Sequence, residues 1–298
     1  MEYKLASNTT TRVISQEFDY SVPASLEEAL ELRDEHGDDV RPLAGGTDLL
    51  IQLKADVRTE SHLMYVNGLD ELDDVSETEE GLEIGATVTY DDLMNSSLVD
   101  QHVPILAEAA SDAGGVQVEK MGTIGGNLCN GSPAASTAPP LLILGAEVVL
   151  ESVDGERIVP IEEFFTGPKR TVLEPNELLT SVRVPTPASD RWAHEEIKRV
   201  TEDLAKVIVS VSLECDDGTV TDCGIGLGCV APTPIRATEA EAAIRGEPAT
   251  EETFARAGEI ASDEISPISD SRSTAEYRRL ITETKVRDLL VDAHETNV

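Results

Sequence analysis

The chain has 298 residues, which suggests about two domains, and 40% of them are hydrophobic, enough to form buried cores. Its 58 Asp and Glu residues against 23 Lys and Arg residues give a formal net charge of −35, which argues against nucleic acid or an anionic membrane surface as a partner. Such a charge is typical of a protein kept soluble in very high salt, where self-repulsion is screened. A halophilic source is our hypothesis for it.

Neither the cysteines nor the histidines have the spacing of a metal site. The four cysteines contain no C-x-x-C pair, and none stands at ligand spacing from one of the five histidines, so zinc or iron–sulfur ligation is not expected. We interpret them as buried free thiols in a reducing cytosol. The N-terminus lacks the apolar segment of a secretory signal and no apolar run reaches 18 residues, so we expect a cytoplasmic protein without a membrane span.

The N-terminal segment predicts a small β-α-β unit. A strand at 18–20 precedes a helix that begins with a Ser25–Glu28 capping box and stops at Gly37. A strand at 40–44, an apolar helix from Leu49 and a strand at 63–66 follow. This order predicts a parallel sheet, with the turn after the second strand at a carboxyl end, where open α/β sheets bind ligands.

The middle of the chain predicts further strands and short helices. We expect a strand at 82–86, helices at 91–96 and 103–113, an apolar helix at 141–144 and a hairpin at 146–160. The proline-containing stretches 168–175 and 185–187 then mark a junction. We therefore expect a first domain over residues 1–184, with subdomains of about 1–60 and 61–184, and a second domain over residues 185–298.

The C-terminal part predicts a small α+β domain. Residues 206–215 alternate between apolar and polar side chains, as in a half-buried strand, and a turn at Asp217-Gly218 leads into a returning strand at 220–230. Gly224, Gly226 and Gly228 lie inside that strand pattern with no helix after them, so we assign them a structural role. Three helices follow, the last with an apolar i, i+3, i+4, i+7 face at 286–293.

Two glycine-rich stretches are the candidate binding elements. Residues 121–140 read M-G-T-I-G-G-N-L-C-N-G-S-P-A-A-S-T-A-P-P, and residues 41–50 read R-P-L-A-G-G-T-D-L-L. Glycine allows close backbone approach, and successive free N–H groups bind anions. Neither stretch is a G-x-G-x-x-G fingerprint. They indicate a cradle for a ligand with two phosphates or a long polar body; a glycine-rich surface loop is the alternative.

These two stretches carry a resemblance that spans nearly the whole chain. A-G-G-T-D-L-L at 44–50 and T-I-G-G-N-L at 123–128 resemble the FAD-binding medium subunit of molybdenum hydroxylases, the family of carbon monoxide dehydrogenase medium chains and the xanthine dehydrogenase FAD domain. P-I-E-E-F-F-T-G at 160–167 and G-L-G-C-V-A-P-T-P-I-R at 226–236 are similar to later segments of that family. The resemblance implies an α+β fold. Its FAD-binding domain has two subdomains, a small β-α-β one and a larger one with a mixed or antiparallel sheet, and an α+β domain of antiparallel strands and helices follows.

The resemblance also implies which residues contact FAD. These are Ala44, Gly45, Gly46, Thr47, Asp48 and Leu49 on one side, Thr123, Gly126, Asn127 and Asn130 on the other, and in addition Gly114, Ser136, Leu179 and Lys198. The family usually has an aspartate where this chain has Ser136, so we expect a weaker, uncharged contact there. Lys198 either supplies positive charge to the flavin or forms a surface salt bridge.

No acid–base pair or nucleophile arrangement stands out, and we assign no catalytic residue and no metal ligand. A flavin supplies its own redox chemistry. By resemblance, the chain is an electron-transfer subunit that receives electrons from a small [2Fe-2S] subunit and a large molybdenum-cofactor subunit and passes them to an external acceptor, in a dimer of heterotrimers. The alternatives are a standalone FAD-dependent oxidoreductase and a structural subunit that has lost its flavin.

Overall fold

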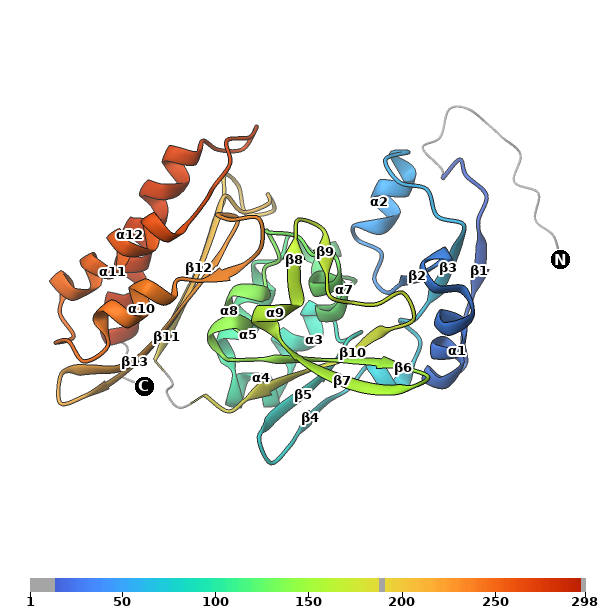
Figure 1. The fold of residues 1–298 in the computed structure, drawn as a ribbon, viewed down its shortest axis with the longest axis horizontal. Coiled ribbons are helices and arrows are strands. Elements are labelled where there is room, and N and C mark those ends of the chain that lie inside the picture. Colours follow the sequence, from blue (N-terminus) through green and yellow to red (C-terminus); the bar gives the residue numbers. More distant parts are fainter. Residues whose placement is uncertain (1–13, 188–190, 296–298) are drawn as a thin grey trace.

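The computed structural model describes residues 14–187 and 191–295 as an elongated molecule in which three larger sheets follow one another along the long axis (Figure 1). The small N-terminal unit lies at one end and the C-terminal helices lie at the other. The second sheet and its helices lie between them. The predicted α+β class, with a parallel unit followed by antiparallel sheets, is confirmed.

The first unit is a three-stranded parallel sheet in the order β1-β3-β2. Its elements are β1 (Asp19–Ser21), α1 (Leu26–His36), β2 (Val40–Leu43), α2 (Leu49–Lys54) and β3 (His62–Tyr65). The central strand β3 begins at His62, so this sheet includes residues on both sides of position 60, near which we expected the subdomain boundary. The Ser25 hydroxyl accepts the Glu28 N–H at 3.2 Å, whereas the Glu28 carboxylate accepts the Ala24 N–H, one residue before the position of a regular capping box.

The second sheet is antiparallel, with the strand order β4-β5-β10-β6-β7. Its strands are β4 (Val75–Glu77), β5 (Gly81–Gly85), β6 (Glu147–Ser152), β7 (Gly155–Pro160) and β10 (Leu178–Pro185). The predictions missed β4 and also β10, the central strand, because prolines at both ends of 178–185 resembled a linker. The apolar core of this unit lies between the sheet and the surrounding helices, and includes Ile84, Leu106 and Val182.

Short helices and one hairpin complete this unit. They are α3 (Tyr90–Asn95), α4 (Ser97–His102), α5 (Pro104–Ser111), α6 (Val116–Glu119), α7 (Ile124–Cys129), α8 (Ala138–Ile143), α9 (Ile161–Phe164), β8 (Phe165–Gly167) and β9 (Arg170–Thr171). The helix predicted over 103–113 is α5 alone, preceded by the unpredicted α4. Thr123 caps α7, accepting the Gly126 N–H at 3.0 Å, so the second glycine stretch begins with a helix rather than an open turn.

The third sheet is antiparallel, in the order β11-β12-β13-β14. Its strands are β11 (Trp192–Ile197), β12 (Val207–Asp216), β13 (Thr219–Gly228) and β14 (Ile235–Arg236), and its helices are α10 (Thr238–Ile244), α11 (Glu251–Glu264) and α12 (Ala275–Glu295). These helices pack on one face around a core that includes Val209, Phe254 and Leu290.

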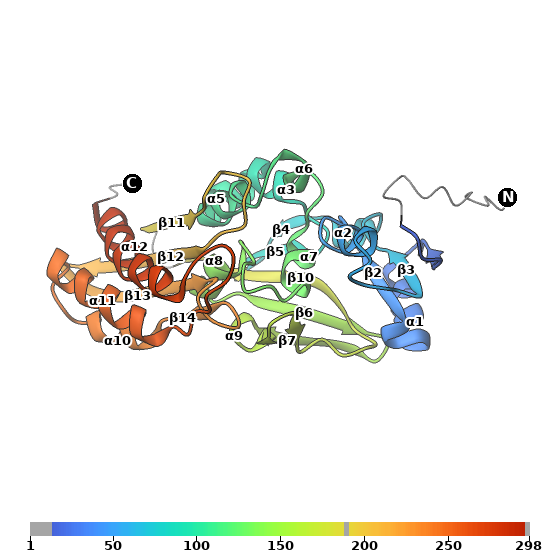
Figure 2. The same ribbon diagram turned by 90° about the horizontal axis from the view of Figure 1, so that it is seen from above.

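Helix α8 packs on the opposite side of β12 and β13 (Figure 2). For this reason the first half of β12 is buried on both faces, with Ile208 and Ser210 fully covered. The half-buried strand that we predicted is found only in its second half, where Ser212 and Glu214 are partly exposed. A Cβ atom at Gly226 would lie 2.3 Å from the Pro139 carbonyl oxygen, and one at Gly224 would lie 2.9 Å from Ile143 Cβ. The structural role predicted for these glycines is confirmed: they let the two domains meet closely.

Residues 14–187 and 191–295 contain neither a candidate membrane span nor a candidate metal site. No helix in these ranges combines the length and apolar character of a membrane span. In the same ranges, no group of three or more His, Cys, Asp or Glu side chains is arranged to hold a metal ion.

Candidate functional site

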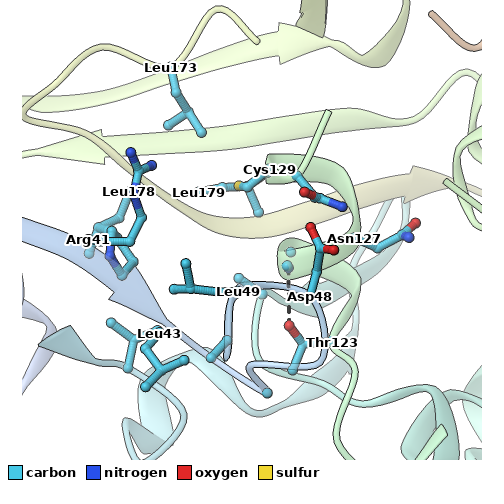
Figure 3. Close-up of a pocket in the computed structure, with 18 of the residues that line it drawn as sticks. Arg41, Leu43, Asp48, Leu49, Thr123, Asn127, Cys129, Leu173, Leu178 and Leu179 are labelled. Carbon is cyan, nitrogen blue, oxygen red and sulfur yellow. Dashed lines mark hydrogen bonds between the residues drawn. The ribbon is translucent and has the colours of Figure 1, made fainter. Parts of the chain in front are cut away.

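A cavity of about 470 Å³ lies where the N-terminal unit meets the unit of the five-stranded sheet, a size typical of small-molecule sites (Figure 3). Its walls are the turn after β2, the start of α7, strand β10 and the β8–β9 hairpin with the segment that follows it. Eleven of the fourteen predicted contact residues line it: Ala44, Gly45, Gly46, Thr47, Asp48, Leu49, Thr123, Gly126, Asn127, Asn130 and Leu179. The structure thus brings both glycine stretches together in one cavity.

The charge of the lining is opposite in sign to that of the chain. Its cations are Arg33, Arg41, Arg58, Lys169 and Arg170, and its carboxylates are Asp38, Asp48, Glu174 and Glu177. Five cations against four carboxylates give a formal charge of +1, whereas the whole chain carries −35. A locally positive cavity in so acidic a protein is suited to an anionic ligand.

The first glycine turn presents unused backbone donors to the cavity. Gly46 adopts φ 69°, a conformation that favours glycine, and its carbonyl oxygen accepts the Leu50 N–H at 3.1 Å to begin α2. The N–H groups of residues 45–49 donate to no other described residue. Consecutive free amides of this kind form a concave anion-binding surface.

The second glycine stretch differs from the first in the use of its backbone amides. The Gly125 N–H donates to the Ala86 carbonyl oxygen at 2.9 Å, and the Gly126 N–H donates to the Thr123 hydroxyl. A Cβ atom at Gly125 would lie 2.7 Å from Ala86, whereas one at Gly126 would meet only the Thr123 hydroxyl. Gly125 is therefore required for packing, and Gly126 keeps the cavity wall flat.

The two stretches also touch each other. A Cβ atom at Gly45 would lie 1.4 Å from the Met121 carbonyl oxygen, so no side chain fits between them. This contact fixes the free amides of the first turn relative to α7.

One part of the cavity is apolar. Leucine side chains from four separate segments face it in Figure 3: Leu43, Leu49, Leu173, Leu178 and Leu179. Such a slot suits a planar apolar group at one end of a ligand whose other parts are polar.

Cys129 borders the cavity on the side of Arg33 and Arg41, so it is not the buried thiol that we expected. Desolvation of its sulfur raises the pKa of the Cys129 thiol to about 12, against a smaller opposite effect of the Arg41 and Arg33 guanidinium groups. The thiol is therefore protonated at neutral pH and is a weak nucleophile.

The β8–β9 hairpin contributes residues that the sequence analysis missed. The Lys169 ammonium donates to Asn130 Oδ1 at 2.8 Å and to Asp48 Oδ2 at 3.3 Å, and so connects the two glycine stretches. The available signal was a Lys-Arg pair directly after G-P in a lysine-poor chain, but it lies in the segment that we interpreted as a junction.

Three predicted residues, Gly114, Ser136 and Lys198, do not line this cavity. They lie instead around a polar cluster between the two domains. The Lys198 ammonium is 3.1 Å from Glu196 Oε2 and 3.1 Å from Asp112 Oδ1, with 6% of its side chain exposed. It is therefore a buried, doubly paired cation rather than the member of a surface salt bridge.

Glu196 is the buried carboxylate of this cluster. Its side chain is 3% exposed, and Oε1 has no hydrogen-bond partner among the described residues. Burial raises the pKa of Glu196 to about 7, although Lys198 and Ser136 act in the opposite direction. Burial likewise lowers the pKa of the neighbouring His194 to about 4, so this imidazole is neutral at pH 7.

Family comparisons cover both domains. Residues 16–187 match the family described as FAD binding domain in molybdopterin dehydrogenase, and residues 192–293 match the CO dehydrogenase flavoprotein C-terminal domain. The chain is 34% identical over 279 residues to the carbon monoxide dehydrogenase medium chain of Hydrogenophaga pseudoflava, covering 93% of this chain and 97% of that protein. It is 31% identical over 278 residues to the xanthine dehydrogenase FAD-binding subunit of Escherichia coli O157:H7, covering 92% and 95%.

Solved structures of related proteins have the same fold over nearly the whole chain. A chain of the carbon monoxide dehydrogenase from Hydrogenophaga pseudoflava superimposes with a TM-score of 0.92 at 36% identity, covering 95% of this chain and 99% of that one. A chain of quinoline 2-oxidoreductase from Pseudomonas putida 86 superimposes with a TM-score of 0.89 at 29% identity, covering 93% and 97%.

Proposed function

This chain belongs to the family of FAD-binding medium subunits of the molybdenum hydroxylases, and on that premise we propose that it is the electron-transfer subunit of a three-subunit dehydrogenase. FAD is its cofactor. When bound, FAD supplies the redox centre through which electrons pass from iron–sulfur clusters to an external acceptor.

The residues of the cavity fit this cofactor. The free amides of residues 45–49 and the net positive lining suit its two phosphates, and the leucine slot suits a planar ring. Asp48 Oδ1 can accept from hydroxyl or ring N–H groups, and the side-chain N–H groups of Asn127 and Asn130 can donate to hydroxyl or ring acceptors, because only their oxygens and Asp48 Oδ2 are bonded within the described residues. The side chain missing at Gly126 leaves room for backbone approach.

The observation that carries the electron-transfer role is the composition of this cavity. Its described lining contains no histidine, and the Cys129 thiol has a raised pKa and no hydrogen-bonded base. The chain thus offers groups that hold a cofactor but no nucleophile–base pair with which to convert a substrate itself. This favours electron transfer over a standalone oxidoreductase.

The partners that we propose are a large molybdenum-cofactor subunit and a small [2Fe-2S] subunit, arranged as a dimer of heterotrimers in the cytoplasm. A halophilic source would account for the acidic surface. In such a complex the large subunit determines the substrate, and access to the flavin determines the acceptor.

The test is to purify the chain with its native partners in high salt and to record its visible spectrum without oxygen. Flavin absorbance should bleach when a substrate of the molybdenum subunit is added to the complex and should persist when the same compound is added to the isolated chain. Bleaching in the isolated chain would instead show that the chain is a standalone oxidoreductase. If the chain takes up no FAD even within its complex, it would be a structural subunit.

A further inference from the structure

We propose that Arg170, at the start of β9, is the side-chain cation that pairs with the phosphates of the cofactor, opposite the free amides of the first glycine turn. The inference rests on the cavity as the FAD site, but not on the electron-transfer role. Neither the family matches nor the motifs assign a function to this hairpin.

The other cations of the cavity each have a partner within the described residues. The Arg33 guanidinium donates to the carbonyl oxygens of Gly37 and Val40, both at 2.6 Å. Arg41 and Arg58 share the Glu60 carboxylate. Their charges serve to hold the N-terminal unit together.

Lys169 is also committed, since its ammonium bonds Asn130 and Asp48. Arg170 is different: within the described residues its guanidinium has neither a hydrogen-bond nor an ion-pair partner. It is exposed and lines the cavity. An unpaired arginine is notable in a chain where acidic residues outnumber basic ones by 58 to 23.

The hairpin that carries Arg170 is fixed at several points. The Lys169 N–H donates to the Gly131 carbonyl oxygen at 2.8 Å, and a Cβ atom at Gly131 would lie 2.8 Å from the Arg170 nitrogen. The Lys169 side chain reaches Asp48, which belongs to the first glycine turn itself. Arg170 is thus held on a short hairpin that is fastened to the amide donors it would complement.

An anion between these two elements would receive both kinds of donor. The amides of residues 45–49 supply directional hydrogen bonds without charge, and Arg170 supplies a planar, permanently charged donor suited to phosphate. The second glycine stretch cannot replace the arginine, because the amides of Gly125 and Gly126 are already used within the protein.

The experiment compares cofactor binding by the full chain after FAD removal, for the original protein, Arg170→Gln and Arg245→Gln. Arg245 is a matched control because it is an exposed arginine of the C-terminal domain, paired with Asp222. Titrations use FAD and riboflavin, which lacks both phosphates. Arg170→Gln should raise the Kd for FAD about tenfold and leave the Kd for riboflavin unchanged. The Kd for FAD should also become less sensitive to added salt.

The outcomes separate the hypotheses. An unchanged Kd for FAD in Arg170→Gln, or an equal loss for FAD and riboflavin, would overturn the role of Arg170. Failure of the original chain to bind FAD would instead count against the site as a whole. Normal cofactor binding without substrate-driven bleaching in the complex would count against electron transfer alone.

Discussion

Gly125 and Gly126 are adjacent in the sequence, yet their missing side chains have different neighbours. At Gly125 a methyl group would overlap the backbone and Cβ atom of Ala86, whereas at Gly126 it would point toward the cavity and meet only the Thr123 hydroxyl. Gly125→Ala should therefore lower the free energy of unfolding by about 1–3 kcal/mol, as overpacking does. Gly126→Ala should lower it by about 1 kcal/mol or less, the value of a disturbed helix cap.

The loss of cofactor binding should be larger in Gly126→Ala than in Gly125→Ala, the reverse of the order for stability. Gly126→Ala should weaken FAD binding, because the added methyl group occupies the cavity wall. Gly125→Ala should bind FAD normally at temperatures where it remains folded. Denaturant unfolding and FAD titration of both variants test this prediction, and the same loss of stability in both would refute the assignment of separate roles.

At this scale the sequence predicted the residues that are part of a continuous motif. Ala44 to Leu49 line the cavity as a run, because one turn carries them all. Arg33, Lys169 and Arg170 were missed because they converge from segments more than a hundred residues apart. Nothing in the spacing of a single sequence reports such convergence.

The contact between β11 and the end of α5 predicts a pH dependence. The pKa of Glu196 is about 7 in the folded protein, above its ordinary value of 4.5, so the folded state binds this proton more tightly than the unfolded chain. The resulting stabilisation is fully present below about pH 4.5 and is lost as the pH rises through about 7. Between these limits the original protein should lose about 1–3 kcal/mol that Glu196→Gln does not lose.

The measurement is the denaturant midpoint of both proteins at constant salt, taken from about pH 5 to about pH 8.5. The many other carboxylates titrate in both proteins, so only the difference between the two curves reports on Glu196. Parallel curves would show that Glu196 stays ionised in the folded state, held by Lys198.

Elements were predicted best where local signals and tertiary structure agree. The hairpin of β6 and β7 and the return from β12 to β13 have tight turns with glycine. Strand β10 was missed because its edges look like a linker, although it is central in its sheet. The burial of β12 could not be predicted, because α8, which covers it, comes from the other domain.

The whole molecule carries a net charge of −35, and this predicts a strong dependence of stability on salt. The unfolding temperature should rise by several degrees between about 0.1 M and about 2 M KCl, because screening reduces the self-repulsion of the compact state. A sucrose series at matched osmolarity serves as the control, since excluded solutes also stabilise proteins without screening charge. An equal rise in sucrose, or none in KCl, would contradict the electrostatic explanation.

At this largest scale, the order of motifs was sufficient to predict the family, the fold class and the cofactor. The division of labour within the site was not predictable. The sequence shows two similar Gly-Gly pairs, and only the packed chain reveals that one leaves its amides free while the other uses them internally.

The glycines of β13 have a consequence for engineering this scaffold. Because Pro139 and Ile143 of α8 rest where side chains at Gly224 and Gly226 would be, the two domains share a surface whose shape is encoded in both halves of the chain. Consider a chimera that joins this first domain to the C-terminal domain of a relative. It would keep the cavity intact only if the relative's strand equivalent to β13 also has glycine at the positions of Gly224 and Gly226. The C-terminal domain should therefore be exchanged together with α8. Recombination at the linker alone would disturb the FAD cavity, although the C-terminal domain contributes no residue to its lining.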